Sequence, residues 1–330
     1  MKIRVIGTGS WGTALAQVLC DNGEDVILYG VSKDEVDDIN NNHRNSKYFD
    51  TLINPKLKAS NDFNIVRDAD VVLLGVPVMA IESVCHQLEE TLDHPVLLIN
   101  VAKGFHPVTK ERLSVAIRSF MNDKLLDLVS LIGPSHAEEV ILRKLTTVNS
   151  VCENDESART VQKIFANDYF RVYTNNDVIG AEIAAATKNV MAIASGVLEG
   201  LGQGDNARAA LMTRGLAEMT RFGMAFGSKK ETFLGLNGVG DLIVTCSSHH
   251  SRNFNCGLNI GKANDASEFL KNNTKTTEGI NTCRVVRELA LEKGIDMPIT
   301  NEVYAVLFEG KRPDEAIRDL MTRPLKAEVI

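Results

Sequence analysis

The chain has 330 residues, 44% of them hydrophobic, and a formal net charge of −7 at pH 7. That length favours two domains with sizeable cores, and the acidic balance argues against nucleic-acid or anionic-membrane partners. The six cysteines lack the paired spacing of a disulfide framework or a zinc site. The N-terminus enters a strand pattern with no export signal, so we expect a cytoplasmic protein with reduced thiols and no metal.

The N-terminal segment has the pattern of a dinucleotide-binding turn. A β-type run, Lys2–Ile6, leads directly into GTGSWG at residues 7–12, and a helical stretch, Thr13–Asn22, and a second strand, Asp25–Tyr29, follow. This strand–turn–helix–strand order is the context that the GxGxxG fingerprint requires.

Each glycine of the fingerprint has a role. Gly7 permits the tight turn, Gly9 lets the backbone approach a pyrophosphate, and Gly12 lets the helix pack close to the strand. The helix N-terminus then offers its N–H groups to the phosphates. The simpler alternative is a plain glycine turn.

The end of the second strand bears on the choice of cofactor. Residues 30–33 read GVSK and include no acidic residue of the kind that binds the ribose 2′-hydroxyl of NAD. A 2′-phosphate is therefore not repelled there, and Ser32 or Lys33 is placed to meet it. Alternatively, Ser32 and Glu35 form a capping box for the next helix, and both interpretations can hold together.

Strand and helix patterns then alternate to about residue 175, which predicts a mostly parallel, doubly wound sheet. The expected strands are Ala69–Val76, Val96–Val101, Leu126–Ile132, Thr147–Cys152 and Phe170–Tyr173, and the expected helices are Val78–Leu92 and Asp155–Ala166. Lys103 and Ser135 come just after two of these strands, where such sheets bind ligands. A solvated loop lysine is the simpler interpretation of Lys103.

A polar break at Asn175–Asp177 ends the alternation, so we predict a Rossmann-like domain over residues 1–177 and a helical domain over residues 178–330. Its expected helices are Val178–Leu201, Asn206–Phe226, Thr282–Glu292, Asn301–Phe308 and Pro313–Met321. The first is apolar nearly all round but is interrupted by Glu182, Lys188 and Asn189, so it is expected to lie in a core and not to span a bilayer.

Lys188 lies in the middle of that apolar helix. Its neighbours at i±3 and i±4 are Ala184, Ala185, Met191 and Ala192, and none offers a counter-charge. Desolvation there would disfavour the ammonium form, and a lysine tuned in this way exchanges a proton with a substrate oxygen. The alternative is a stem on apolar neighbours with its head in water. We also expect methionine to be tolerated at this position.

Two later stretches add polar groups. Asp241 follows a glycine-rich stretch, where it either orients Lys188 or caps a helix. Ser251, Arg252 and Asn253 supply a guanidinium fork and hydrogen-bonding groups suited to a phosphate, or else a polar loop.

Several stretches together resemble one family, the bacterial-type NAD(P)-dependent glycerol-3-phosphate dehydrogenases. They occur in order over almost the whole chain and read GTGSWGTALA, VAKG, GPSHAEE, TKNV, GDNARAALMTRGLAEM, GVGDLIVTC, HSRN and TEG. The resemblance implies hydride transfer between NADPH or NADH and dihydroxyacetone phosphate, giving sn-glycerol 3-phosphate for phospholipids. The expected partner is this small molecule. No nucleic acid or stable membrane insertion is expected, and a homodimer is compatible with the sequence.

The resemblance also implies roles for individual residues. Lys188 corresponds to the proton acceptor. The substrate-binding positions are Lys103, Gly133, Ser135, Lys188, Asp241, Ser251, Arg252 and Asn253. Beside Gly7, Gly9 and Gly12, the cofactor-binding positions are Ser10, Trp11, Lys103, Ala137, Arg252, Thr276 and Glu278. A valine is common at the position of Thr276, and His136 stands where relatives carry an aromatic residue and is assigned no role.

Two other classes compete with this interpretation. One is another two-domain dehydrogenase, of the 6-phosphogluconate or 3-hydroxyacyl-CoA type. The other is a non-catalytic NADPH sensor, which has no need of a lysine in an apolar helix.

Overall fold

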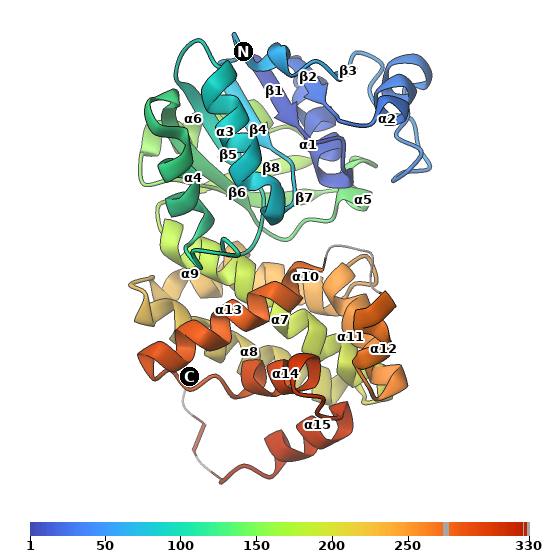
Figure 1. Ribbon diagram of the computed structural model, residues 1–330, viewed down its shortest axis with the longest axis vertical. Helices are drawn as coiled ribbons and strands as arrows, with labels where there is room; N and C mark the ends of the chain where they lie inside the picture. The colour runs from blue at the N-terminus through green and yellow to red at the C-terminus, as the bar shows by residue number, and fades with distance from the viewer. Residues whose placement is uncertain (273–276, 326, 329–330) are drawn as a thin grey trace. The chain divides into compact units, whose positions relative to one another are not determined.

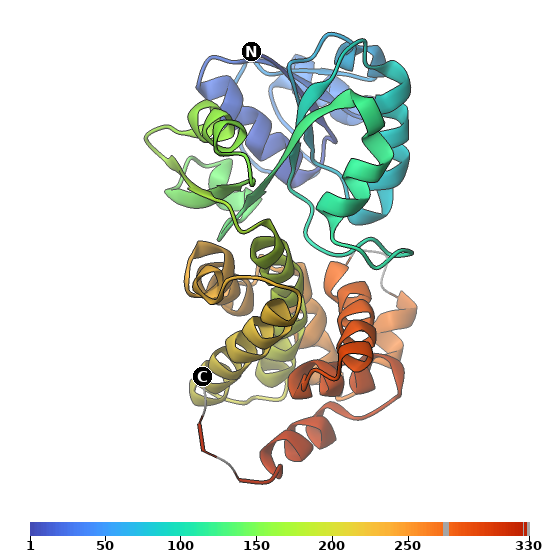
Figure 2. The same ribbon diagram turned by 90° about the vertical axis from the view of Figure 1, so that its left-hand side faces the viewer.

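The computed structural model describes residues 1–272, 277–325 and 327–328 (Figures 1 and 2). The chain divides into two compact units, Met1–Val178 and Ile179–Ile330. The division falls one residue after the predicted boundary. Each unit is described by itself.

The first unit is built on an eight-stranded sheet with the order β3-β2-β1-β4-β5-β6-β7-β8. The strands are β1 (Lys2–Ile6), β2 (Asp25–Tyr29), β3 (Lys58–Ser60), β4 (Val71–Leu74), β5 (Val96–Asn100), β6 (Leu125–Ile132), β7 (Thr146–Val151) and β8 (Phe170–Asn175). Neighbouring strands are parallel except β6 and β7, which are antiparallel. The predicted doubly wound sheet is confirmed. The short edge strand β3 was not expected, because its three residues carry no apolar pattern.

Helices cover both faces of this sheet (Figure 2). They are α1 (Ser10–Asp21), α2 (Lys33–Asp37), α3 (Ile81–Thr91), α4 (Leu113–Met121), α5 (Ala137–Val140) and α6 (Asp155–Phe165), with shorter turns at Asp38–Asn42, Phe63–Val66, Val78–Ala80 and Asn122–Lys124. In β4, Val71 and Leu73 pack in the core under α1 and α6, whereas Val72 and Leu74 pack in the core under α3 and α4. A strand buried on both faces reads as a continuous apolar run, which is why VVLL was recognisable in the sequence.

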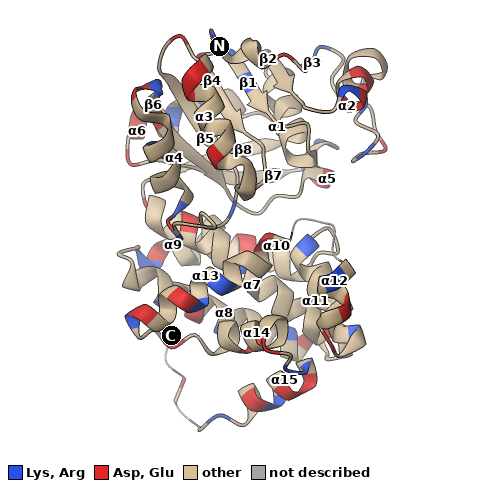
Figure 3. Ribbon diagram, viewed as in Figure 1, with Lys and Arg blue, Asp and Glu red and all other residues tan. Residues whose placement is uncertain are grey.

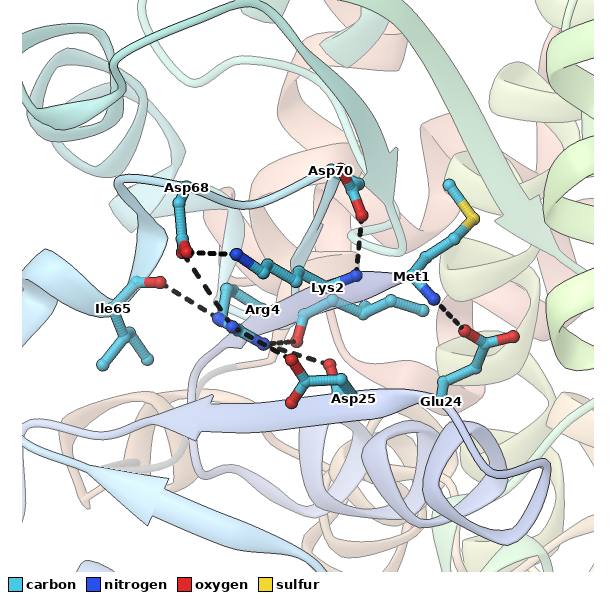
Figure 4. A network of polar contacts seen from close by, with 9 residues as sticks. Met1, Lys2, Arg4, Glu24, Asp25, Ile65, Asp68 and Asp70 are labelled. Atoms are coloured by element: carbon cyan, nitrogen blue, oxygen red, sulfur yellow. Dashed lines mark hydrogen bonds and ion pairs between the residues drawn. The ribbon is translucent and has the colours of Figure 1, made fainter.

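The N-terminal ends of the central strands are held by a polar network (Figure 4). The buried guanidinium of Arg4, on β1, donates to the carbonyl oxygens of Ile65 and Asp25 at 3.0 Å each. Lys2 adds an ion pair with Asp68 at 2.6 Å. These contacts fix β1 to β2 and to the segment that leads into β4, so the fingerprint turn at the opposite end of β1 starts from a rigid strand.

The second unit consists of helices α7 (Val178–Gly200), α8 (Asp205–Ala225), α9 (Lys230–Leu234), α10 (Asp241–Ser247), α11 (Arg252–Ala263), α12 (Ser267–Asn272), α13 (Glu278–Lys293), α14 (Pro298–Phe308) and α15 (Pro313–Met321), with a π-helical turn at Leu236–Gly240. Among the described residues, α7 alone is long and apolar enough to cross a membrane. Within its most apolar window, 89% is buried in the structure, as in the core helix of a soluble protein.

Helices α7 and α11 pack backbone against backbone. A Cβ atom at Gly257 of α11 would overlap the carbonyl oxygen of Ile193, and one at Gly196 of α7 would overlap that of Phe254. Only glycine permits this approach. A polar loop was the alternative expected for residues 251–253, but Ser251 is the N-cap of α11 and Arg252 and Asn253 are its first residues. The glycines of α11 obscure its helical pattern. The close packing brings the N-terminus of α11 to the middle of α7.

One half-buried carboxylate ties distant parts of the first unit together. Asp21, at the end of α1, accepts hydrogen bonds from Arg143 at 2.8 Å, Tyr169 at 2.7 Å and Asn54 at 2.7 Å. Burial opposes its ionisation, but these hydrogen bonds outweigh burial and hold the pKa of Asp21 below its usual value. The ionised Asp21 and its three partners therefore stabilise the fold at pH values above about 4, the pKa of an aspartate in the unfolded chain. This stability is lost as the pH falls through the lower pKa of Asp21 in the folded protein.

We predict that Asp21→Asn lowers the free energy of unfolding at pH 7 by about 2 kcal/mol. The loss should shrink on acidification below about pH 4, where the wild-type carboxylate is also protonated. Urea unfolding at several pH values checks this, with Asp123→Asn, an exposed aspartate, as the control. An equal loss at all pH values would show that the charge of Asp21 is unimportant.

Candidate active site

The turn after β1 has the geometry of a phosphate cradle. Gly7 has φ +111°, which L side chains rarely adopt, and a Cβ atom at Gly12 would overlap the Gly7 carbonyl oxygen. At Gly9, by contrast, a Cβ atom would meet nothing within 4 Å, so the backbone there is open to a ligand. Among the described residues, no side chain caps the N-terminus of α1. Its N–H groups fit a pyrophosphate, and the unit fits a dinucleotide.

Three predicted substrate-binding residues lie together at the ends of β5 and β6. The ammonium of Lys103 donates to the carbonyl oxygen of Gly133 at 3.3 Å, and the hydroxyl of Ser135 donates to the same oxygen at 3.0 Å. Both side chains are half-buried. Lys103 is therefore held beside the sheet edge and is not a solvated loop lysine. Ala137, the first residue of α5, is buried next to this group, and His136 precedes it without capping the helix.

The second unit holds a buried ion pair. Lys188 is 4% exposed in the middle of α7, and its ammonium donates to the carboxylate of Asp241 at 2.5 Å and to the hydroxyl of Thr245 at 2.7 Å. Asp241 is fully buried at the start of α10, and Thr245 lies one turn later on the same helix. The Thr245 hydroxyl also donates to the carbonyl oxygen of Asp241 at 2.6 Å. Lys188 is thus fixed by two groups of α10.

This pair resolves two alternatives from the sequence. Asp241 contacts Lys188 directly and is not the N-cap of α10, because Gly240 occupies that position. The neighbours of Lys188 on α7 offer no counter-charge, as expected, but α10 supplies one. Lys188 is therefore neither a lone desolvated cation nor a side chain whose head reaches water. Removing its charge would leave a carboxylate in the core, so methionine alone is no longer expected to be tolerated.

Cys246 follows Thr245 on α10 and is also buried. Burial raises the pKa of its thiol to about 12, an effect that Lys188 reduces and Asp241 reinforces. The thiol is protonated at neutral pH and has no role as a nucleophile. Lys188 is the group of this cluster that is suited to proton transfer.

The start of α11 lies close to Asn189, the residue after Lys188. Ser251 is the N-cap, and its hydroxyl accepts the N–H of Phe254 at 3.2 Å. The amide oxygen of Asn253 accepts the N–H of Gly279, the second residue of α13, at 2.9 Å. A Cβ atom at Gly279 would lie 2.8 Å from the carbonyl oxygen of Asn189, so α7, α11 and α13 meet at the residue after Lys188.

Arg252 is the exposed member of this group. No described residue forms an ion pair or hydrogen bond with its guanidinium, and the N–H groups of the α11 N-terminus lie in the same turn. A guanidinium fork next to a helix N-terminus is suited to a phosphate. Glu278 begins α13 and is half-buried, whereas Thr276 lies outside the described residues.

The contacts of two further residues were not predicted. Thr245 contacts Lys188, and only its spacing of one helical turn from Asp241 could have indicated this. Glu35 was interpreted as half of a capping box. Ser32 does cap α2 by accepting the N–H of Glu35 at 3.4 Å, but the Glu35 carboxylate is hydrogen-bonded to Thr8 in the fingerprint turn instead.

A dinucleotide-binding unit followed by a helical unit with a buried, ion-paired lysine defines a two-domain nicotinamide-dependent dehydrogenase. Residues 2–158 match the N-terminal family described as NAD-dependent glycerol-3-phosphate dehydrogenase, and residues 177–318 match its C-terminal family. The glycerol-3-phosphate dehydrogenase [NAD(P)+] of Streptococcus uberis is 46% identical over 99% of this chain and 98% of its own length.

Solved structures of glycerol-3-phosphate dehydrogenases have the same fold as this chain. The glycerol-3-phosphate dehydrogenase of Coxiella burnetii, 34% identical, superimposes with a TM-score of 0.88 over 97% of this chain and 98% of its own. The yeast enzyme GPD1, 28% identical, gives 0.84 over 98% and 99%. The chain belongs to the NAD(P)-dependent glycerol-3-phosphate dehydrogenase family.

The buried pair generates a stability prediction. Lys188→Met should lower the free energy of unfolding by about 3–5 kcal/mol, because it leaves the Asp241 carboxylate buried without its ammonium. The double variant Lys188→Met/Asp241→Asn should recover most of this loss. Urea unfolding measures both, and Lys262→Met, on the exposed side of α11, is the control. If Lys188→Met were as stable as the wild type, the Lys188–Asp241 pair would carry no charge.

Proposed function

We propose that the protein is an NAD(P)-dependent sn-glycerol-3-phosphate dehydrogenase. It interconverts dihydroxyacetone phosphate and sn-glycerol 3-phosphate, the backbone precursor of glycerophospholipids, and acts in the cytoplasm. The observation that carries the proposal is the buried Lys188–Asp241–Thr245 cluster in the same unit as the exposed Arg252. It offers a proton donor and a phosphate-binding cation in one unit.

The cofactor, when bound at the fingerprint, supplies the hydride for the carbonyl carbon. Negative charge then develops on the carbonyl oxygen, which needs a donor that stabilises and protonates it. The Lys188 ammonium is this donor. Asp241 and Thr245 hold its nitrogen in place. In the reverse direction, the same nitrogen takes the proton of the substrate hydroxyl.

Substrate binding is assigned to the remaining polar groups. Arg252 and the start of α11 bind the phosphate, and Asn253 positions this turn through its hydrogen bond to Gly279. Lys103, Gly133 and Ser135 form a second polar set, which the resemblance assigns to the substrate as well. Binding energy gained at the phosphate orients the carbonyl for reaction.

The role of Lys188 is tested in the double variant, which avoids the stability loss of the single one. We predict that Lys188→Met/Asp241→Asn lowers kcat by about 10²–10⁴, the range for losing a proton-transfer group. NADPH binding, followed by the fluorescence of Trp11, the chain's single tryptophan, should change little. Asp241→Asn alone serves as the matched control. A double variant that retains more than about a tenth of wild-type kcat would remove Lys188 from the mechanism.

The phosphate site is tested at Arg252. Arg252→Lys keeps the charge but loses the bidentate fork, so it should mainly raise KM for dihydroxyacetone phosphate. Arg252→Ala should raise KM further and also lower kcat. Dihydroxyacetone without its phosphate is the chemical control, because its slow turnover should be unaffected by either change. Unchanged KM and kcat in both variants would place the phosphate elsewhere.

A further inference from the structure

A buried carboxylate touches the fingerprint turn. Glu35, the third residue of α2, is 8% exposed, and its carboxylate accepts the hydroxyl of Thr8 at 2.5 Å. Thr8 stands between the first two glycines of the fingerprint. Its side chain packs against Gly30 at the end of β2, where a Cβ atom would collide with the Thr8 methyl group. The Glu35 carboxylate therefore lies near the end of β2, although residues 30–33 themselves include no acidic residue.

In dinucleotide-binding sheets, the end of the second strand lies near the ribose of the cofactor. An acidic side chain at the end of the second strand binds the ribose 2′-hydroxyl of NAD, and its charge repels the 2′-phosphate of NADP. By position alone, Glu35 would disfavour NADPH.

Lys47 opposes this effect. Its ammonium donates to the other carboxylate oxygen of Glu35 at 2.6 Å, and its side chain is 62% exposed whereas that of Glu35 is 9% exposed. The hydrogen bond to Glu35 raises the pKa of Lys47, so the ammonium stays charged. Figure 3 shows residues of both signs on α2, which carries the acidic member of the pair.

The segment that carries Lys47 is fixed to the same turn. Asn45, 1% exposed, donates to the carbonyl oxygen of Thr8 at 2.8 Å and to the hydroxyl of Thr13 at 2.9 Å. Lys47 is therefore held two residues from a direct contact with the fingerprint and does not extend freely into solvent.

We propose that Lys47 determines how well this enzyme accepts a 2′-phosphate, by neutralising Glu35 and presenting the exposed cation at the adenosine end of the cofactor. The proposal deepens the proposed function and rests on it only for the identity of the cofactor. It also replaces Ser32 as the group expected there, because the Ser32 hydroxyl caps α2.

Two other cations lie nearby. Arg44 is within 3.8 Å of Asp50, which engages its charge. Lys33, at the start of α2, is exposed and is the main competitor, so the experiment includes it.

The test uses adenosine 2′,5′-bisphosphate and AMP, which differ only in the 2′-phosphate, so turnover plays no part. Isothermal titration of the full chain gives the ratio of the two affinities. We expect Lys47→Met to lower this ratio at least about tenfold while AMP binding stays within about twofold. Lys47→Arg should keep the ratio, and Glu35→Gln, which retains an acceptor for Thr8, should raise it.

The coupling of the two residues gives the sharper test. In the Glu35→Gln background, Lys47→Met should lower the ratio less than in the wild type, because no carboxylate is left to be unmasked. Lys163→Met, an exposed lysine on α6, is the control and should change nothing. A ratio within twofold of wild type in Lys47→Met, or an equal loss in Lys33→Met, would overturn the proposal. Failure to reduce dihydroxyacetone phosphate, with the ratios as expected, would instead contradict the proposed function.

Discussion

A charge buried in an apolar helix has to be compensated, and this constraint shapes the second unit. Lys188 is surrounded on α7 by residues that cannot pair with it, so its counter-charge comes from α10. The π-helical turn at Leu236–Gly240 leads directly into Asp241 and sets where α10 begins. Breaking such a pair costs more than forming it gains, so the geometry of the ammonium is fixed more tightly than in a surface ion pair.

Close helix packing in the same unit brings the start of α11 to the middle of α7. Glycines of α7 and α11 allow the two backbones to touch, and Gly279 allows α13 to join them. The start of α11, with the exposed Arg252, is thereby held close to Asn189, the residue after Lys188. In the first unit, the network around Arg4 fixes one end of β1 while the glycine turn occupies the other.

Local patterns predicted much of this arrangement. The fingerprint, the apolar runs of β4 and β5, and the apolar helix with its one lysine were all legible, because each depends on residues close in sequence. Contacts between segments that are distant in the sequence could not be predicted in this way. Asp241 and Thr245 contact Lys188 from another helix, and Glu35 contacts the fingerprint turn from α2, so no local pattern indicates these contacts. The helix α11 was hidden because the glycines that let it pack also weaken its helical pattern.

Chemical rescue tests whether the Lys188 ammonium donates the proton to the substrate oxygen. The measurement is the rate of dihydroxyacetone phosphate reduction by a Lys188→Ala/Asp241→Asn enzyme with increasing methylammonium, compared with tetramethylammonium, which has the same charge but no N–H. We expect a very slow enzyme whose rate rises and saturates with methylammonium only. Wild-type turnover without any amine, or equal rescue by tetramethylammonium, would contradict it.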